Sequence, residues 1–102
     1  MDKKKAEILT SLKAFKKKNK LDRMYFFGSL AGGKGHRWSD IDLVVVANRF
    51  RGKGILERAP KLYLAWDLKF PVDFLCYTPE EFNKLKKQVS IVREAVKEGI
   101  EI

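Results

Sequence analysis

The feature that most restricts the fold is the segment from Asp40 to Ala47, in which two acids open an apolar run. Every residue from Leu43 to Ala47 is apolar, so both faces of this segment should be covered, and we expect a central β-strand over 41–47. Side chains two residues apart on a strand point the same way, so Asp40 and Asp42 should share a face, with their Cα atoms roughly 6–7 Å apart. Burying such carboxylates is costly unless a cation neutralises them, so the pair is a candidate cation site.

Two other segments place polar groups beside apolar runs. Asp73 lies near the start of an apolar segment, 71–76, that is expected to be another strand and could join the acid pair if the strands are neighbours. Gly28 and Ser29 follow an aromatic-rich segment, 23–27, which is expected to be a strand that ends at the glycine. A glycine lets the backbone approach a phosphate closely, and a hydroxyl and free N–H groups can donate to phosphate oxygens.

Three acids and a Gly–Ser turn predict a site for a divalent metal ion and a phosphate group. Carboxylate oxygens favour Mg²⁺ or Mn²⁺, and two such ions about 3.5–4 Å apart can hold the attacking and leaving oxygens of a phosphoryl displacement. The alternative is that the acids only end strands in solvent and that Ser29 caps a helical turn.

The remaining pattern predicts a small α/β domain. Helices are expected over 3–20, 55–68, 79–87 and 89–98, the third of them beginning at the Thr78–Pro79 N-cap. With the three strands, they predict a single α/β (α+β) domain over 1–102, with a short mixed sheet and helices packed on one side. Cys76 alternates with Asp73 along its strand, so it is expected in the core.

Charge and composition restrict the partners. The formal net charge is +9, and residues 1–51 carry 13 Lys and Arg but only 5 Asp and Glu. Such a basic half favours a polyanion such as a nucleotide, RNA or an acidic protein, although lysines on the first helix could equally form a solvated face. No apolar run approaches the ~20 residues of a membrane span. One cysteine cannot form an internal disulfide, so we expect a cytoplasmic protein without a membrane partner.

The motif residues carry a family resemblance. Gly28-Ser29, Ala31, Gly33 and Ser39-Asp40-Ile41-Asp42-Leu43, with Asp73 downstream, resemble the minimal nucleotidyltransferase family of the DNA polymerase beta-like nucleotidyltransferase superfamily. The resemblance covers about residues 23–77. It implies the nucleotidyltransferase fold and the transfer of a nucleoside monophosphate, with AMP from ATP as the first expectation, to a hydroxyl of a protein or other acceptor.

The resemblance also implies roles for individual residues. Asp40 and Asp42 would be ligands of two Mg²⁺ ions, for which Mn²⁺ could substitute. Asp73 would bind the catalytic ion and help to deprotonate the acceptor, so all three acids would be catalytic. Gly28 and Ser29 would hold the triphosphate.

The chain departs from the motif of this family at one position, and the resemblance also implies a partner protein. The arginine that is usual in the motif falls on Gly32, and Lys34 or Arg37 is a hypothetical substitute. The family implies a helical HEPN-like partner, to which the protein would be the antitoxin, and so small a domain needs that partner or a homo-oligomer to complete its pocket. The alternative function is a non-catalytic antitoxin or nucleic-acid-binding module that retains the fold.

Overall fold

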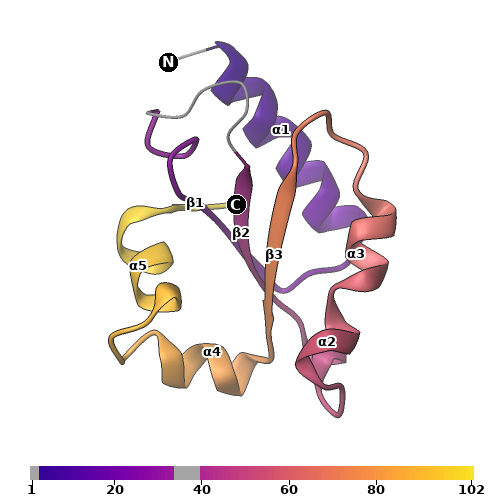
Figure 1. Ribbon diagram of the computed structural model, residues 1–102, viewed down its shortest axis with the longest axis vertical. Coiled ribbons are helices and arrows are strands. Elements are labelled where there is room, and N and C mark those ends of the chain that lie inside the picture. The colour runs from indigo at the N-terminus through magenta and orange to yellow at the C-terminus, as the bar shows by residue number, and fades with distance from the viewer. Residues whose placement is uncertain (1–2, 34–39) are drawn as a thin grey trace.

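The computed structural model describes residues 3–33 and 40–102, and within them four strands form one mixed sheet. The strand order is β3–β2–β1–β4 (Figure 1), with bounds β1 (Arg23–Phe27), β2 (Ile41–Val46), β3 (Val72–Tyr77) and β4 (Ile100–Glu101). β2 pairs antiparallel with β1 and parallel with β3. The three expected strands are confirmed, and the most apolar of them lies inside the sheet.

The fourth strand, β4, is not expected from the sequence. It pairs antiparallel with β1, matching Ile100 with Phe26 and Glu101 with Tyr25. Two residues are too few to show the alternation by which a strand is recognised, so only the tertiary pairing defines it.

Helices cover both faces of the sheet, not one as expected. The helices are α1 (Lys3–Lys18), α2 (Ile55–Arg58), α3 (Pro60–Ala65), α4 (Pro79–Leu85) and α5 (Ile91–Glu98), with a short 3₁₀ turn η1 (Asn48–Phe50) after β2. Figure 1 shows α1 and α3 on one side of the sheet and α4 and α5 on the other. Successive side chains of β2 point to opposite faces and both sets are apolar, so each face needs its own cover.

Each face has its own hydrophobic cluster. On the first, Leu12 and Phe15 of α1 pack with Leu43 and Val45 of β2. The second joins residues of β1 and β2 to α4 and α5: Tyr25, Val44, Val46, Phe82, Val92 and Ala95. The small mixed α/β class is confirmed, while the one-sided arrangement of helices is wrong because the second cluster requires α4 and α5.

The single helix expected over 55–68 is divided in two. Pro60 has no N–H to donate and occupies the first position of α3, so α2 ends at Arg58. The two helices run beside β3, the outer strand of the sheet. The Tyr63 hydroxyl of α3 accepts the backbone N–H of Phe74 at 3.2 Å, so one outward-facing group of this strand is already paired.

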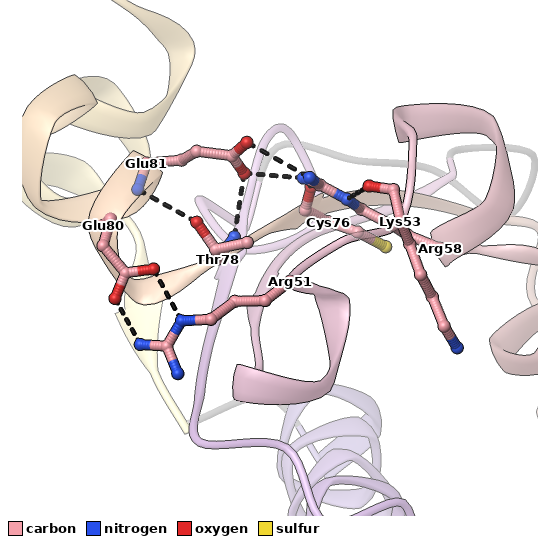
Figure 2. A network of polar contacts seen from close by, with 7 residues as sticks. All are labelled: Arg51, Lys53, Arg58, Cys76, Thr78, Glu80 and Glu81. Atoms are coloured by element: carbon pink, nitrogen blue, oxygen red, sulfur yellow. Dashed lines mark hydrogen bonds and ion pairs between the residues drawn. The ribbon is translucent and has the colours of Figure 1, made fainter.

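A buried guanidinium ties α2 to β3 and α4 (Figure 2). Arg58 donates to the Lys53 carbonyl at 2.9 Å, to the Cys76 carbonyl at 3.2 Å, and to both carboxylate oxygens of Glu81 at 2.6 and 3.1 Å. Glu81 also accepts the Thr78 N–H and gives its own N–H to the Thr78 hydroxyl, which confirms the predicted N-cap as a capping box. The Arg58 hydrogen bonds lower the pKa of Glu81.

Arg58→Met is expected to lower the free energy of unfolding by about 2 kcal/mol, because it leaves the buried Cys76 carbonyl without this donor and the Glu81 carboxylate without its guanidinium partner. Chemical denaturation measures the loss. The pKa of Glu81 is lowered in the folded state, so the difference between the proteins should narrow in acid, as pH falls through that pKa. Arg51→Met is the control, since the Arg51–Glu80 pair is 52% and 63% exposed and should contribute little. Equal losses in the two variants would contradict the prediction.

Membrane insertion of a helix has no support in the described ranges. No helix there combines the length and the apolar character that crossing a bilayer requires.

Candidate active site

The register of the sheet places two of the predicted acids side by side. Asp42 of β2 pairs directly with Asp73 of β3, which confirms that their strands are neighbours. Asp42 shares its face of the sheet with Val44 and Val46, the face covered by α4 and α5. The cover does not enclose the acids, because Asp42 is only half-buried and Asp73 is exposed. Both carboxylates therefore lie on one face, at the amino ends of two parallel strands.

The third acid, Asp40, lies just outside the strand. β2 begins at Ile41, whose N–H donates to the Pro71 carbonyl at 2.8 Å, and Asp40 precedes it as an exposed residue. Only Asp42 of the pair therefore lies within the strand itself, and Asp40 lies one residue before it. Asp40 still lies close enough to interact electrostatically with Asp42.

The three acids act on one another without forming a closed group. Burial raises the pKa of Asp42, and the Asp73 and Asp40 carboxylates raise it further, in that order. Within residues 3–33 and 40–102, no three acidic, histidine or cysteine side chains are gathered closely enough to hold a metal ion. The acids are collected at one end of the sheet, but their side chains do not converge on a common point.

The Gly–Ser turn lies directly against Asp42. Gly28 follows β1, whose last residue pairs with Asp42, and has φ of +87°. A Cβ on Gly28 would lie 2.3 Å from Asp42 Oδ2, so only glycine leaves room for the carboxylate. The Gly28 carbonyl accepts the Gly32 N–H at 3.1 Å, which closes the turn, and Ser29 is exposed. The turn and the acid pair therefore belong to one site.

Gly32, where the motif usually has arginine, lies in a different environment. A Cβ on Gly32 would meet only the Gly28 and Ser29 carbonyl oxygens, at the ordinary distances of 3.7 and 3.8 Å. The described surroundings thus leave room for a side chain here. Lys34 and Arg37, the hypothetical substitutes, lie outside the described residues, as does Ser39 of the motif.

Cys76 has no part in this site. It lies on the opposite face of the sheet from Asp73, in the cluster beneath α1, and is 4% exposed. Burial raises the pKa of its thiol to about 11, so a thiolate is disfavoured at neutral pH. The prediction that it packs in the core is confirmed.

The donor set suits a hard divalent cation. Carboxylate oxygens are the ligands that Mg²⁺ prefers, and a bound cation would offset the repulsion that raises the pKa of Asp42. The close approach at Gly28 brings a backbone turn to the same carboxylate. The residues therefore fit the implied metal in their chemistry.

Comparison with protein families decides the assignment. The family model described as a nucleotidyltransferase domain matches residues 8–102. The chain belongs to the nucleotidyltransferase domain family. A comparison with curated protein sequences finds no match.

The nucleotidyltransferase fold is also found in a solved structure. A crystal structure at 1.40 Å of a protein from Sulfolobus solfataricus, provisionally assigned as a nucleotidyltransferase, superposes with a TM-score of 0.61. It is 22% identical, and the match covers 83% of this chain and 79% of that one. At this identity the likeness establishes the fold.

The nucleotidyltransferase domain has one neighbour of the acids that no polar motif indicates. Phe27 pairs with Asp42 across the β1–β2 ladder and lies on the same face, half-buried at the margin of the second cluster. It forms an apolar wall beside the carboxylate. Its only signal in the sequence is the alternation of the β1 residues.

Proposed function

We propose that this protein transfers a nucleoside monophosphate from a nucleoside triphosphate, with ATP as the expected donor, to a hydroxyl acceptor. The observation that carries the proposal is the pairing of Asp42 with Asp73 on adjacent strands, with the backbone of Gly28 against Asp42. Membership of the nucleotidyltransferase domain family supports the reaction class.

In this proposal each site residue has a separate task. Asp40, Asp42 and Asp73 would hold two Mg²⁺ ions, or Mn²⁺ in their place, and these ions would neutralise the triphosphate and the charge that develops during an in-line displacement. The Ser29 hydroxyl donates to phosphate oxygens, and Gly28 keeps the backbone close to them.

Asp73 is better placed than Asp42 to meet the acceptor. It is exposed on the outer strand of the sheet, whereas Asp42 is half-buried. The acceptor oxygen attacks the α-phosphorus, the bond to pyrophosphate breaks, and Asp73 takes up the hydroxyl proton. The new bond joins the acceptor oxygen to the nucleoside monophosphate.

The acceptor is proposed to reach this exposed site on another chain. Asp40 and Asp73 are both exposed, which leaves the acid end of the sheet open to a second surface. A helical HEPN-like protein with a reactive hydroxyl is the proposed partner, and the protein would then act as its antitoxin. A second copy of this chain is the alternative source of the covering surface.

Binding of Mg–ATP tests the first step. A ligand present at ten times its Kd stabilises the native state by about 1.4 kcal/mol, which raises the melting temperature of a domain this size by roughly 5–10 °C. We expect this rise with millimolar ATP and Mg²⁺ together, and a much smaller one when EDTA replaces Mg²⁺. No rise under either condition would overturn the proposal.

The position of a radioactive label then tests the reaction. With the HEPN-like partner as acceptor, a label in the α-phosphate of ATP should become acid-stable on that partner, while a label in the γ-phosphate should not. The opposite pattern would indicate phosphoryl transfer. Binding without transfer of either label would favour the non-catalytic alternative.

Gly32→Arg tests the non-catalytic alternative, which is favoured because this chain has glycine where the motif usually has arginine. The added Cβ meets only ordinary contacts, so the guanidinium should reach the phosphates and tighten Mg–ATP binding by about tenfold, the effect of one charge-assisted hydrogen bond. Titration calorimetry measures the change, and Gly32→Gln is a control that carries polar bulk without the charge. Equal affinities of the Arg and Gln variants would show that a cation at this position does not contact the nucleotide.

A further inference from the structure

A line of lysines follows the outer surface of α1 to its carboxyl end. Lys13, Lys16 and Lys17 are spaced i, i+3 and i+4, which places them on one side of α1, and Lys20 follows in the turn after the helix. We call these four residues the lysine stripe. Together with Leu21 and Ile102 they line a shallow hollow of about 430 Å³. Three of the lysines are exposed and Lys16 is half-buried.

In the part of the chain that the structure describes, no lysine of the stripe forms an ion pair with an acidic side chain. The ion pairs in that part of the chain involve Arg23, Arg51 and Arg58, and none of them involves a lysine of the stripe. Lys16 Nζ donates to a main-chain oxygen of Ile102 at 2.9 Å. Arg49 adds a further cation, since its guanidinium donates to the Asn19 carbonyl beside the stripe.

The acid nearest to the stripe in the sequence is Asp22, which forms no ion pair with a lysine of the stripe among the described residues. Asp22 is engaged elsewhere, because its carboxylate accepts the Asn48 N–H at 2.8 Å. The stripe therefore presents four cations within eight residues, the last of them two residues beyond the end of α1.

Lys20 is held in a backbone conformation that favours glycine. α1 ends with the Leu21 N–H donating to the Lys16 carbonyl at 3.1 Å and the Lys20 N–H donating to the Lys17 carbonyl at 3.2 Å. Lys20 has φ of +54°, and among the described residues it is the one non-glycine with a positive φ. Helices commonly place glycine at this position because a Cβ is unfavourable there. The fold thus carries a lysine where glycine would be more stable.

We propose that the lysine stripe binds the phosphodiester backbone of single-stranded RNA. A row of lysines, three of them exposed, matches a strand that carries charge at regular intervals, and lysines bind phosphates as flexible point charges without reading a sequence. The stripe leads into the start of β1, whereas Asp42 pairs with the end of β1, so the inference goes beyond the proposed function and does not depend on it.

Fluorescence anisotropy with a labelled 20-nucleotide RNA of mixed sequence tests the proposal across a salt series. If all four lysines contact phosphates, the logarithm of the affinity should fall against the logarithm of salt concentration with a slope of about −2.8. Replacing Lys13, Lys17 and Lys20 together by Gln should weaken binding at least tenfold and reduce the slope to about −0.7. The matched control replaces the exposed Lys61, Lys84 and Lys97 by Gln, which gives the same net charge.

Three outcomes would overturn the proposal. The first is an equal loss of binding in the control triple variant, which would mean that net charge alone attracts RNA. The second is undiminished binding by the stripe variant. The third is a poly-glutamate peptide that displaces the RNA at equal charge concentration, because the stripe would then suit an acidic protein.

Lys20→Gly separates binding from stability. We expect its melting temperature to rise by a few degrees, because glycine tolerates the positive φ, while its affinity for RNA falls several-fold. Unchanged RNA affinity in this variant would contradict a role for Lys20. Asp42→Asn should bind RNA as the wild type does, so failure of the nucleotidyl-transfer proposal would leave this result unaffected.

Discussion

Asp42→Asn is expected to reduce nucleotidyl transfer about 1,000-fold while leaving the fold at least as stable as the wild type. Asp42 is the acid at the centre of the site, next to Asp73 in the ladder and against Gly28. Loss of a metal-binding carboxylate should remove about 4 kcal/mol of transition-state stabilisation. Stability should not fall in metal-free buffer, because burial and two neighbouring acids already raise the pKa of this carboxyl.

Two measurements on the same preparation check this prediction. Transfer is followed with ATP labelled in the α-phosphate, and the melting temperature is recorded with and without Mg²⁺. Asp67→Asn is the control, since Asp67 is an exposed acid on the connection between α3 and β3. An Asp42→Asn variant that retains more than a tenth of the activity would exclude Asp42 as a metal ligand.

Gly28→Ala is expected to reduce transfer about 100-fold through its effect on the same carboxylate. The added Cβ would lie 2.3 Å from Asp42 Oδ2, so the carboxylate must move away from the turn. Moving a catalytic group by about 1 Å can lower the rate about 100-fold. The positive φ of Gly28 adds a cost of about 1 kcal/mol in stability.

The control for Gly28→Ala is Gly52→Ala. Gly52 has φ of +78°, close to that of Gly28, but no described atom lies within 4 Å of its Cβ position. Both variants should therefore lose similar stability in denaturant, and only Gly28→Ala should lose activity. If Gly52→Ala lost as much activity, the loss would reflect backbone strain alone and not displacement of Asp42.

Local sequence patterns predict the strands and caps well because their causes are local. β1 has the expected bounds, β2 lies inside the sheet as its apolar composition predicts, and Thr78 caps α4 with the predicted Pro79 in the first turn. The pairing of Asp42 with Asp73 was an expectation conditional on neighbouring strands, and the parallel register fulfils it.

Features that depend on distant contacts could not be predicted in the same way. β4 is defined only by its partner strand, and the two-sided cover depends on where α4 and α5 pack after the chain turns at Thr78. Asp40 lies outside β2 because the ladder with β3 begins at Ile41. The apolar pattern of the sequence alone does not determine that starting point. Arg58 has an ordinary place in the sequence, and only the fold buries it beside Glu81.

The hydrogen bonds along the outer side of β3 restrict how this chain can assemble. Tyr63 occupies the N–H of Phe74 and Arg58 occupies the carbonyl of Cys76, two groups that an incoming strand would need. Sheet extension by another chain is therefore blocked along that rim. A partner that reaches Asp73 must approach over the open face above the acids, and would have to present a helix or loop there and not a strand.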